Sequence, residues 1–265
     1  MAKVYAITNR KGGCGKSFTV ASLGAGLARQ GKKVLCIDAD NSHSLTISMG
    51  VEHPELLEIS TSTIISDIIN KRSIDPKAGI IHHSEGVDLM PANSSLTGME
   101  LALASMIGRE TILRQYVSKI RPLYDAVLID TCPSMDLLAL NALAAADKAI
   151  IPVVPKYLDA KGLELLLKSI AQIQEFINPN LTIGGILLTM VDLRTNLAKK
   201  IIKVIDEAYG EKIHIFKNHV PHSIRAAEAC ATGKSIFEYD PNGKVAAAYA
   251  SLTKELLSKA VSGIA

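Results

Sequence analysis

The stretch that decides the fold is residues 4–20, VYAITNRKGGCGKSFTV. Its apolar start, Val4–Thr8, predicts a buried strand, and the residues from Phe18 onward have a helical pattern. Between them lies a glycine-rich turn that ends in Gly15-Lys16-Ser17, the order of a phosphate-binding loop. The glycines let successive backbone N–H groups turn toward one point, and the N-terminus of the following helix adds positive potential there. We therefore expect a nucleotide phosphate site made of Lys11, Gly12, Gly13, Cys14, Gly15, Lys16, Ser17 and Phe18.

Three polar side chains of this loop have distinct expected roles. Lys16 supplies a mobile positive charge for the β- and γ-phosphates, and Ser17 holds Mg²⁺ through its hydroxyl. Lys11 adds a second lysine close to where the usual motif begins with glycine. A second lysine beside Lys16 is either solvated or meets further negative charge.

The composition excludes several classes of protein. The chain has 265 residues, 48% of them hydrophobic and 4% aromatic, with no run of eighteen apolar residues. A disordered, collagen-like or membrane-spanning protein is thereby excluded. The four cysteines form no CxxC pair, and the first residues lack a signal-like apolar stretch. A reduced, cytoplasmic environment is expected.

Short aliphatic runs alternate with longer amphipathic ones along the chain. This alternation predicts an α/β fold, a single P-loop NTPase domain over residues 1–265 with a mostly parallel twisted sheet and helices on both faces. The expected strands are Val4–Thr8, Val34–Asp38, Val87–Met90, Ala126–Asp130, Ala149–Val153, Ile183–Thr189 and Ile213–Phe216. The expected helices are Ser17–Gln30, Ile64–Asn70, Gly98–Arg121, Leu137–Ala146, Ala160–Phe176, Thr195–Tyr209, Ile224–Ala231 and Val245–Val261. The charges and Pro54 of Gly50–Ser62 predict an exposed loop.

Several further segments carry a resemblance to a known family. They are the loop KGGCGKS, Asp38-Ala39-Asp40 at the end of the second strand, and VLID ending at Asp130. Residues 124–147 (YDAVLIDTCPSMDLLALNALAAAD), 188–197 (LTMVDLRTNL) and 220–240 (VPHSIRAAEACATGKSIFEYD) extend the match to nearly the whole chain. Together these residues resemble the ParA/MinD family of deviant Walker ATPases, and within it the ParA/Soj branch.

The resemblance implies a role for each motif residue. It implies ATP and Mg²⁺ as ligands and an ATP-sandwich homodimer, in which Lys11 reaches the phosphates bound by the partner subunit. It further implies that Asp130 holds Mg²⁺ through water and that Asp40 orients the attacking water. Phosphoryl transfer depends on such positioning and charge neutralisation. For Asp38 two roles stay open, namely the second shell of the metal or a cap of the strand end.

The sequence departs from the family pattern beside the hydrolytic site. Asn41-Ser42-His43-Ser44 stands where the family usually has Pro-Gln-Gly-Asn, Phe18 where it has Thr, and Thr131-Cys132 where it has Cys-Pro. These changes concern the rate of hydrolysis more than nucleotide binding. Cys14 is either a small apolar filler, which we favour, or a thiol of low pKa in the positive field of the loop.

Basic residues in the last third of the chain favour DNA as the partner. Residues 183–265 hold 11 basic and 8 acidic side chains, whereas residues 1–182 hold 18 of each. Arg194 and Arg225 match family residues that bind DNA without sequence preference. Lys199, Lys200 and Lys203 are spaced to share the solvent side of one helix. His222 stands where the family often has Arg, which lowers the affinity or makes it depend on pH.

These residues imply a nucleotide-controlled DNA-binding protein. No helix-turn-helix is expected before the phosphate loop, so sequence-specific binding to DNA is not expected. Binding then rests on contacts to DNA phosphates from both subunits, and it weakens as the salt concentration rises. The resemblance implies that ATP binding permits DNA binding and that hydrolysis releases the DNA. It also implies a ParB-like centromere-binding partner, a cytoplasmic and nucleoid-associated location, and a role in partitioning a plasmid, chromosome or mobile element.

Two other functions share the fold. A MinD-like membrane-associated ATPase ends in an amphipathic helix, and 251–264 offers Leu252, Leu256, Leu257, Val261 and Ile264 on one side. Its basic residues are few and it lacks an aromatic anchor, so we expect it to pack on the core without inserting into a membrane. A metabolic P-loop enzyme of the dethiobiotin-synthetase kind needs a substrate pocket, for which the sequence offers no motif. Iron–sulfur carriers are disfavoured because no paired cysteines are present.

Overall fold

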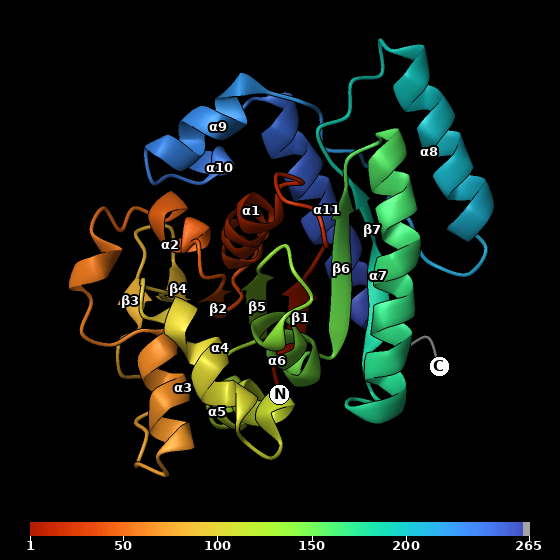
Figure 1. Cartoon of the computed structure of the whole chain (residues 1–265). Helices are drawn as coiled ribbons and strands as arrows, with labels where there is room; N and C mark the ends of the chain where they lie inside the picture. Colours follow the sequence, from red (N-terminus) through yellow and green to blue (C-terminus); the bar gives the residue numbers. More distant parts are fainter. Residues whose placement is uncertain (262–265) are drawn as a thin grey trace.

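Seven strands form one sheet in the computed structural model of the chain, which describes residues 1–261 (Figure 1). The strands lie in the order β3-β4-β2-β5-β1-β6-β7, and only β3 at the edge is antiparallel to its neighbour. Their bounds are β1 Lys3–Ile7, β2 Val34–Ala39, β3 Ile81–His82, β4 Val87–Met90, β5 Ala126–Thr131, β6 Lys148–Val153 and β7 Thr182–Leu188. The predicted α/β fold with a mostly parallel sheet is confirmed.

Helices cover both faces of the sheet (Figure 1). Their bounds are α1 Lys16–Ala28, α2 Ser44–Ser48, α3 Thr61–Ile69, α4 Leu96–Ala104, α5 Ile112–Ile120, α6 Leu137–Ala145, α7 Tyr157–Phe176, α8 Asn196–Tyr209, α9 Ile224–Ala231, α10 Ile236–Tyr239 and α11 Lys244–Val261, with 3-10 turns at Pro54–Leu56, Arg109–Thr111 and Arg121–Leu123. Successive strand residues point to opposite faces. Val4 and Ala6 therefore join the core under α3 and α5 to α8, whereas Tyr5 and Ile7 join the core under α1, α2 and α9 to α11.

The predicted strand Ile213–Phe216 is wrong. This segment forms only one isolated bridge, between Ile215 and Ile186 of β7. Beyond it, the backbone N–H of Lys217 donates to Glu255 of α11 at 3.2 Å. An apolar run of four residues cannot distinguish a strand from a buried connection of this kind.

Two other segments also differ from the prediction. The expected helix Gly98–Arg121 is divided into α4 and α5, because Gly108 has a φ of 73°, which an α-helix does not accommodate. The expected exposed loop Gly50–Ser62 is buried at its end, where Ser60 caps α3 together with Thr63. At Gly108 the backbone conformation of glycine interrupts the helical pattern. At Ser60 the helix cap begins α3 inside a segment whose charges predicted a loop.

The C-terminal helix packs on the core, as predicted. Leu252 and Leu256 of α11 are buried against α1, and Leu257 is half-buried beside them. The side chain of Val261 and all of Ile264 lie outside the described residues. Among residues 1–261, no helix combines the length and apolarity that crossing a membrane requires.

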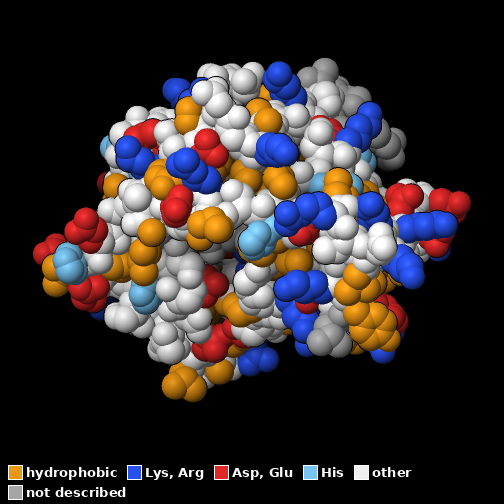
Figure 2. Space-filling view, turned by 90° about the horizontal axis from the view of Figure 1, so that it is seen from above, with side chains coloured by type: hydrophobic (Ala, Val, Ile, Leu, Met, Phe, Trp, Pro, Cys, Tyr) orange, Lys and Arg blue, Asp and Glu red, His pale blue; other side chains and the backbone are white. Residues whose placement is uncertain are grey.

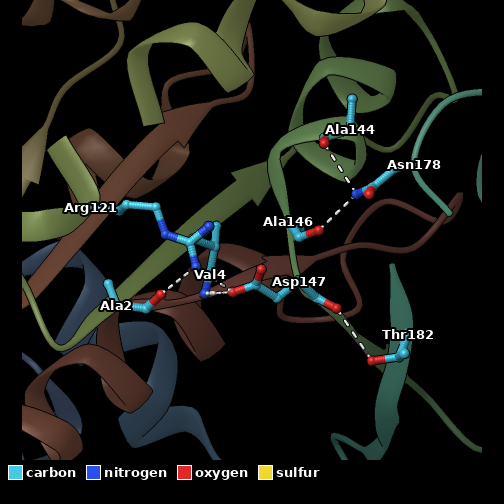
Figure 3. A network of polar contacts seen from close by, with 8 residues as sticks. All are labelled: Ala2, Val4, Arg121, Ala144, Ala146, Asp147, Asn178 and Thr182. Carbon is cyan, nitrogen blue, oxygen red and sulfur yellow. Dashed lines mark hydrogen bonds and ion pairs between the residues drawn. The ribbon is translucent and has the colours of Figure 1, made fainter. Parts of the chain in front are cut away.

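A polar network joins the amino ends of three strands (Figure 3). The carboxylate of Asp147 accepts hydrogen bonds from the Val4 N–H at 2.9 Å and from Arg121 at 3.0 Å, while its backbone oxygen accepts from Thr182 of β7. Nearby, the amide nitrogen of Asn178 donates to the carbonyl oxygens of Leu143, Ala144 and Ala146 at 2.8 to 3.1 Å. Side chains therefore hold the amino ends of these strands. The carboxyl ends are left for the functional site.

Replacing Asn178 by Ala is expected to lower the free energy of unfolding by about 2 kcal/mol, because buried carbonyl oxygens lose their donor. Urea unfolding followed by circular dichroism measures the change. Asn180→Ala, at an exposed position two residues away, is the matched control and should change stability by less than about 0.5 kcal/mol. Equal effects of the two substitutions would contradict the assigned role of Asn178.

Candidate nucleotide-binding site

The phosphate loop has the backbone that its glycines predict. Gly13 and Gly15 have φ angles of 68° and 84°, in the left-handed region that other residues rarely adopt. Gly15 immediately precedes α1, and no side chain caps that end of the helix. The first N–H groups of α1 are therefore available to an anion at the carboxyl edge of the sheet.

Side chains at the ends of the neighbouring strands hold this loop in place. Asn9 donates to the carbonyl oxygen of Pro152 in β6 at 2.5 Å and accepts from the backbone N–H of Lys11 at 3.0 Å. Thr189, just after β7, donates to the carbonyl oxygen of Cys14 at 2.9 Å. The loop is thus fixed between β1, β6 and β7 before any ligand binds.

The two lysines of the loop lie in different places. Lys16 is 6% exposed, and its Nζ donates to the carbonyl oxygen of Lys11 at 3.1 Å, inside the loop. Lys11 is half-buried, and its Cε lies 3.6 Å from where a Cβ on Gly162 of α7 would stand. The Lys11 side chain therefore lies against α7 at Gly162.

Two buried carboxylates lie side by side behind the loop. Asp38 and Asp130 occupy paired positions of the parallel strands β2 and β5, and both are fully buried. The Asp38 carboxylate accepts hydrogen bonds from the N–H and hydroxyl of Thr46 at 2.8 and 2.6 Å, and from the Asp40 N–H at 3.0 Å. Burial nevertheless raises the pKa of Asp38 to about 6. Its hydrogen bonds fix the chain that follows β2.

Asp130 is less fully partnered. Its Oδ1 accepts from the N–H of Thr131 at 3.1 Å, but its buried Oδ2 has no hydrogen-bond partner within residues 1–261. Burial, and then the charge of Asp38, raise the pKa of Asp130 well above its usual range, while the Ser17 hydroxyl acts in the opposite direction. An orphaned buried carboxylate oxygen near a hydroxyl suits a divalent cation or its water, so these residues fit Mg²⁺.

Asp40 and the phosphate loop line one cleft of about 390 Å³, within the range of small-molecule sites. The Oδ1 of Asp40 accepts a hydrogen bond from the N–H of Ser42 at 2.9 Å, which fixes the turn after β2. The cleft is lined by Gly12, Gly13, Gly15, Lys16, Ser17, Phe18, Asp40, Asn41, Ser42, Ser44, Pro133 and Met190. Three of the four residues that depart from the family pattern at 41–44 thus face the same cleft as Lys16.

A second, mainly apolar cavity of about 210 Å³ adjoins this cleft, and the sequence does not predict it. Gly15, Phe18 and Met190 line both, and Met190 has a φ of 51°. The other lining residues are Thr189, Val220, Pro221, His222, Ser223, Ala226, Ala227, Cys230 and Tyr249. The motif segments 188–197 and 220–240 supply most of them, and the pairing of Val191 with Pro221 brings these segments together here.

The basic residues lie on exposed segments around this edge of the sheet. Lys199, Lys200 and Lys203 are exposed on α8, and Lys203 pairs with Glu207 at 3.5 Å. Arg194 precedes α8, and Arg225 is exposed on α9 with its guanidinium 5.8 Å from the ring centre of Tyr239. Figure 2 shows Lys and Arg side chains spread over this face, with acidic side chains among them and further acidic ones at its left and right margins.

Comparisons with known proteins agree with this geometry. A family model described as an AAA domain matches residues 2–183. The chain is 36% identical to the sporulation initiation inhibitor protein Soj of Bacillus subtilis over 97% of this chain and 98% of Soj. It is 34% identical to the chromosome partitioning protein ParA of Myxococcus xanthus over 98% of this chain and 89% of that protein.

A solved structure is also similar. It is the cobyrinic acid a,c-diamide synthase from Mycobacterium smegmatis with bound ATP analog and magnesium, at a TM-score of 0.86 and 31% identity. The similarity covers 100% of this chain and 98% of that chain.

The thiols give a test of the site as described. Cys14, Cys36 and Cys132 are buried, and burial raises the pKa of the Cys14 thiol although Lys16 acts to lower it, which supports the filler role of Cys14. We expect Ellman's reagent to label one thiol, the half-buried Cys230, in the folded protein and four in denaturant. Cys230→Ser should leave none reactive. Rapid labelling of this variant would show that Cys14 is a reactive thiolate.

Proposed function

The chain belongs to the ParA/Soj branch of the ParA/MinD family of P-loop ATPases, and from this premise we propose that it hydrolyses ATP with Mg²⁺, dimerises around ATP and binds DNA in that state. The observation that carries the proposal is the pair of adjoining cavities at the carboxyl edge of the sheet. One is lined by N–H groups, Lys16 and Asp40, and the other is apolar. A triphosphate suits the first and a nucleobase the second.

Residues of this chain would hold the phosphates and the metal as follows. The N–H groups of the loop and Lys16 bind the β- and γ-phosphates, which requires Lys16 to exchange the Lys11 carbonyl oxygen for a phosphate oxygen. Ser17 and the unpartnered oxygen of Asp130 hold Mg²⁺, the latter through water. Bound Mg²⁺ neutralises charge on the phosphate oxygens.

Asp40 is proposed to orient the attacking water in the cleft. Asp38 then acts as a positioning residue, because its carboxylate holds the backbone N–H of Asp40 and the start of α2. Of the two roles left open by the sequence, these bonds support the cap of the strand end. Hydrolysis is expected to be slow and to be stimulated by a ParB-like partner.

Lys11 is proposed to act on the nucleotide of a second subunit. In the single chain its side chain lies along α7 beside Gly162, so the sandwich dimer requires it to leave α7 and turn outward. The negative charge of the partner's triphosphate supplies the attraction for that movement.

Three alanine variants separate these roles. Lys16→Ala should lose ATP binding, Lys11→Ala should bind ATP but stay monomeric, and Asp40→Ala should dimerise without hydrolysing. Nucleotide binding is measured by calorimetry, mass by light scattering and turnover by phosphate release. Lys32→Ala, at an exposed lysine outside the cleft, is the control and should behave as the wild type. ATP-dependent dimers of Lys11→Ala would contradict the sandwich arrangement.

The dimer is proposed to bind double-stranded DNA through backbone phosphates, with both arginines and the α8 lysines in contact. The exposure of these residues at the edge that holds the cleft supports the proposal. Arg194 and Arg225 follow segments that pair with each other, since the His222 N–H donates to the Val191 carbonyl oxygen at 3.2 Å. A cytoplasmic, nucleoid-associated protein that helps to partition a replicon is the corresponding cellular role.

The alternatives have weaker support. Membrane association of the MinD kind would require α11 to release Leu252 and Leu256 from the core. A synthase role is suggested by the name that several similar solved structures share, and by no residue described above.

DNA binding is tested with a random-sequence duplex and with anionic liposomes, in ATP, ADP or no nucleotide, at several salt concentrations. We expect ATP-dependent DNA binding that weakens with salt, and no liposome binding. Arg194→Glu and Arg225→Glu should each weaken binding and reduce the salt slope by about one for each phosphate that is no longer bound. Arg72→Glu, at an exposed arginine that pairs with Asp67, is the control. Liposome binding would favour the MinD-like function, and binding to neither would favour the metabolic one.

A further inference from the structure

The guanidinium of Arg194 is not free to meet a ligand. Its Nε and Nη2 donate to the two carboxylate oxygens of Asp192 at 2.8 and 2.7 Å, and its backbone N–H donates to the same carboxylate at 3.1 Å. The Arg194 side chain is 90% exposed and that of Asp192 is 35% exposed. An arginine at the proposed DNA surface is therefore already held in a two-pronged ion pair within its own chain.

The backbone around Asp192 presents this carboxylate in a fixed position. Val191, one residue before, donates its N–H to the Val220 carbonyl oxygen at 3.0 Å. The carbonyl oxygen of Asp192 accepts from the N–H and the hydroxyl of Thr195 at 3.2 and 3.0 Å, and Thr195 caps α8. The backbone that carries Asp192 is thus held in the turn that joins β7 to α8, and the ion pair is formed within this turn.

The ionisation of Asp192 is favoured by its neighbours. Arg194, and to a smaller extent His222, lower the pKa of Asp192 to about 2. The carboxylate is consequently charged at any pH at which the protein would meet DNA. No proton is needed to open or close the pair.

A carboxylate and a phosphate offer the same feature to arginine, namely two oxygens spaced for its paired donors. On this ground, and resting on the DNA binding proposed above, we infer that Asp192 is an internal competitor that holds Arg194 when DNA is absent and must be displaced by a DNA phosphate. DNA binding then exchanges one ion pair for another at this residue. Asp192 thereby lowers the affinity for DNA and eases its release.

Arg225 differs from Arg194 in this respect. Among the ion pairs of residues 1–261, none includes Arg225, whose guanidinium lies over the ring of Tyr239 instead. A phosphate can reach Arg225 without displacing a carboxylate. Only the contribution of Arg194 is therefore expected to depend on Asp192.

The experiment measures binding of the ATP-bound, full-length protein to a random duplex at fixed salt. Asp192→Asn should bind roughly fivefold more tightly than the wild type, since the competing charge is gone from each subunit. Asp192→Glu, which keeps a carboxylate, should stay near the wild type. Glu211→Gln removes the same charge at an exposed position near the end of α8, outside the ion pairs of the described residues, and should change the affinity by less than about twofold. Asp192→Ser repeats the charge removal with a second side chain.

A double-mutant cycle assigns the effect to Arg194. In the Arg194→Ala background, Asp192→Asn should no longer change the affinity. The inference is overturned if Asp192→Asn binds as the wild type does or more weakly, if Glu211→Gln tightens binding equally, or if the gain persists without Arg194. Failure of the proposed function is recognised separately, because the wild type itself would then bind no DNA, and this would overturn the inference as well.

Discussion

The parallel pairing of β2 with β5 places two carboxylates next to each other in the core. Much of the site depends on which groups compensate these two buried charges. Asp38 and Asp130 occupy the same level of neighbouring strands, and both are fully buried. Two such charges are unfavourable unless each finds compensating partners. Asp38 finds them in Thr46 and in the N–H of Asp40, whereas one oxygen of Asp130 has no hydrogen-bond partner within residues 1–261. One carboxylate therefore holds the loop that carries Asp40, and the other is the one that we propose to hold Mg²⁺ through water.

The sequence predicts the parts of this arrangement that depend on neighbouring residues. Strands buried on both faces are continuous apolar runs, so six of them are located to within about two residues. The phosphate loop is defined by glycines whose positive φ angles are local requirements, as at Gly13 and Gly15. The structure brings Gly12, Gly13, Gly15, Lys16, Ser17 and Phe18 of this loop into one cleft with Asp40, whereas Lys11 and Cys14 are outside its lining.

What the sequence does not reveal depends on contacts between distant segments. The second cavity requires the end of β7 to pair with the segment after His219, through a bridge between Val191 and Pro221 that neither segment encodes alone. Ile213–Phe216 has the composition of a strand, yet among the described residues it forms only one isolated bridge, between Ile215 and Ile186 of β7. The pair of Asp192 and Arg194 is only two residues apart, but a count of basic residues treats the arginine as a free charge. That Asp192 pairs with Arg194 becomes evident only from the folded turn between β7 and α8.

The distance between the nucleotide cleft and the proposed DNA surface is short in sequence and in structure. Met190 lines both cavities, and Asp192 and Arg194 follow it directly. The partner segment contributes Pro221 and His222 to the second cavity before α9 begins with Ile224 and Arg225. These segments are bonded to each other through the bridge between Val191 and Pro221 and the hydrogen bond from the His222 N–H to the Val191 carbonyl oxygen. The small net charge of +3, with Arg194 already paired with Asp192, is consistent with the proposal that one subunit binds DNA weakly and that two subunits bind it adequately. In the proposed dimer, weak contacts add across two subunits, so dissociation of the dimer would release the DNA while Arg194 pairs again with Asp192.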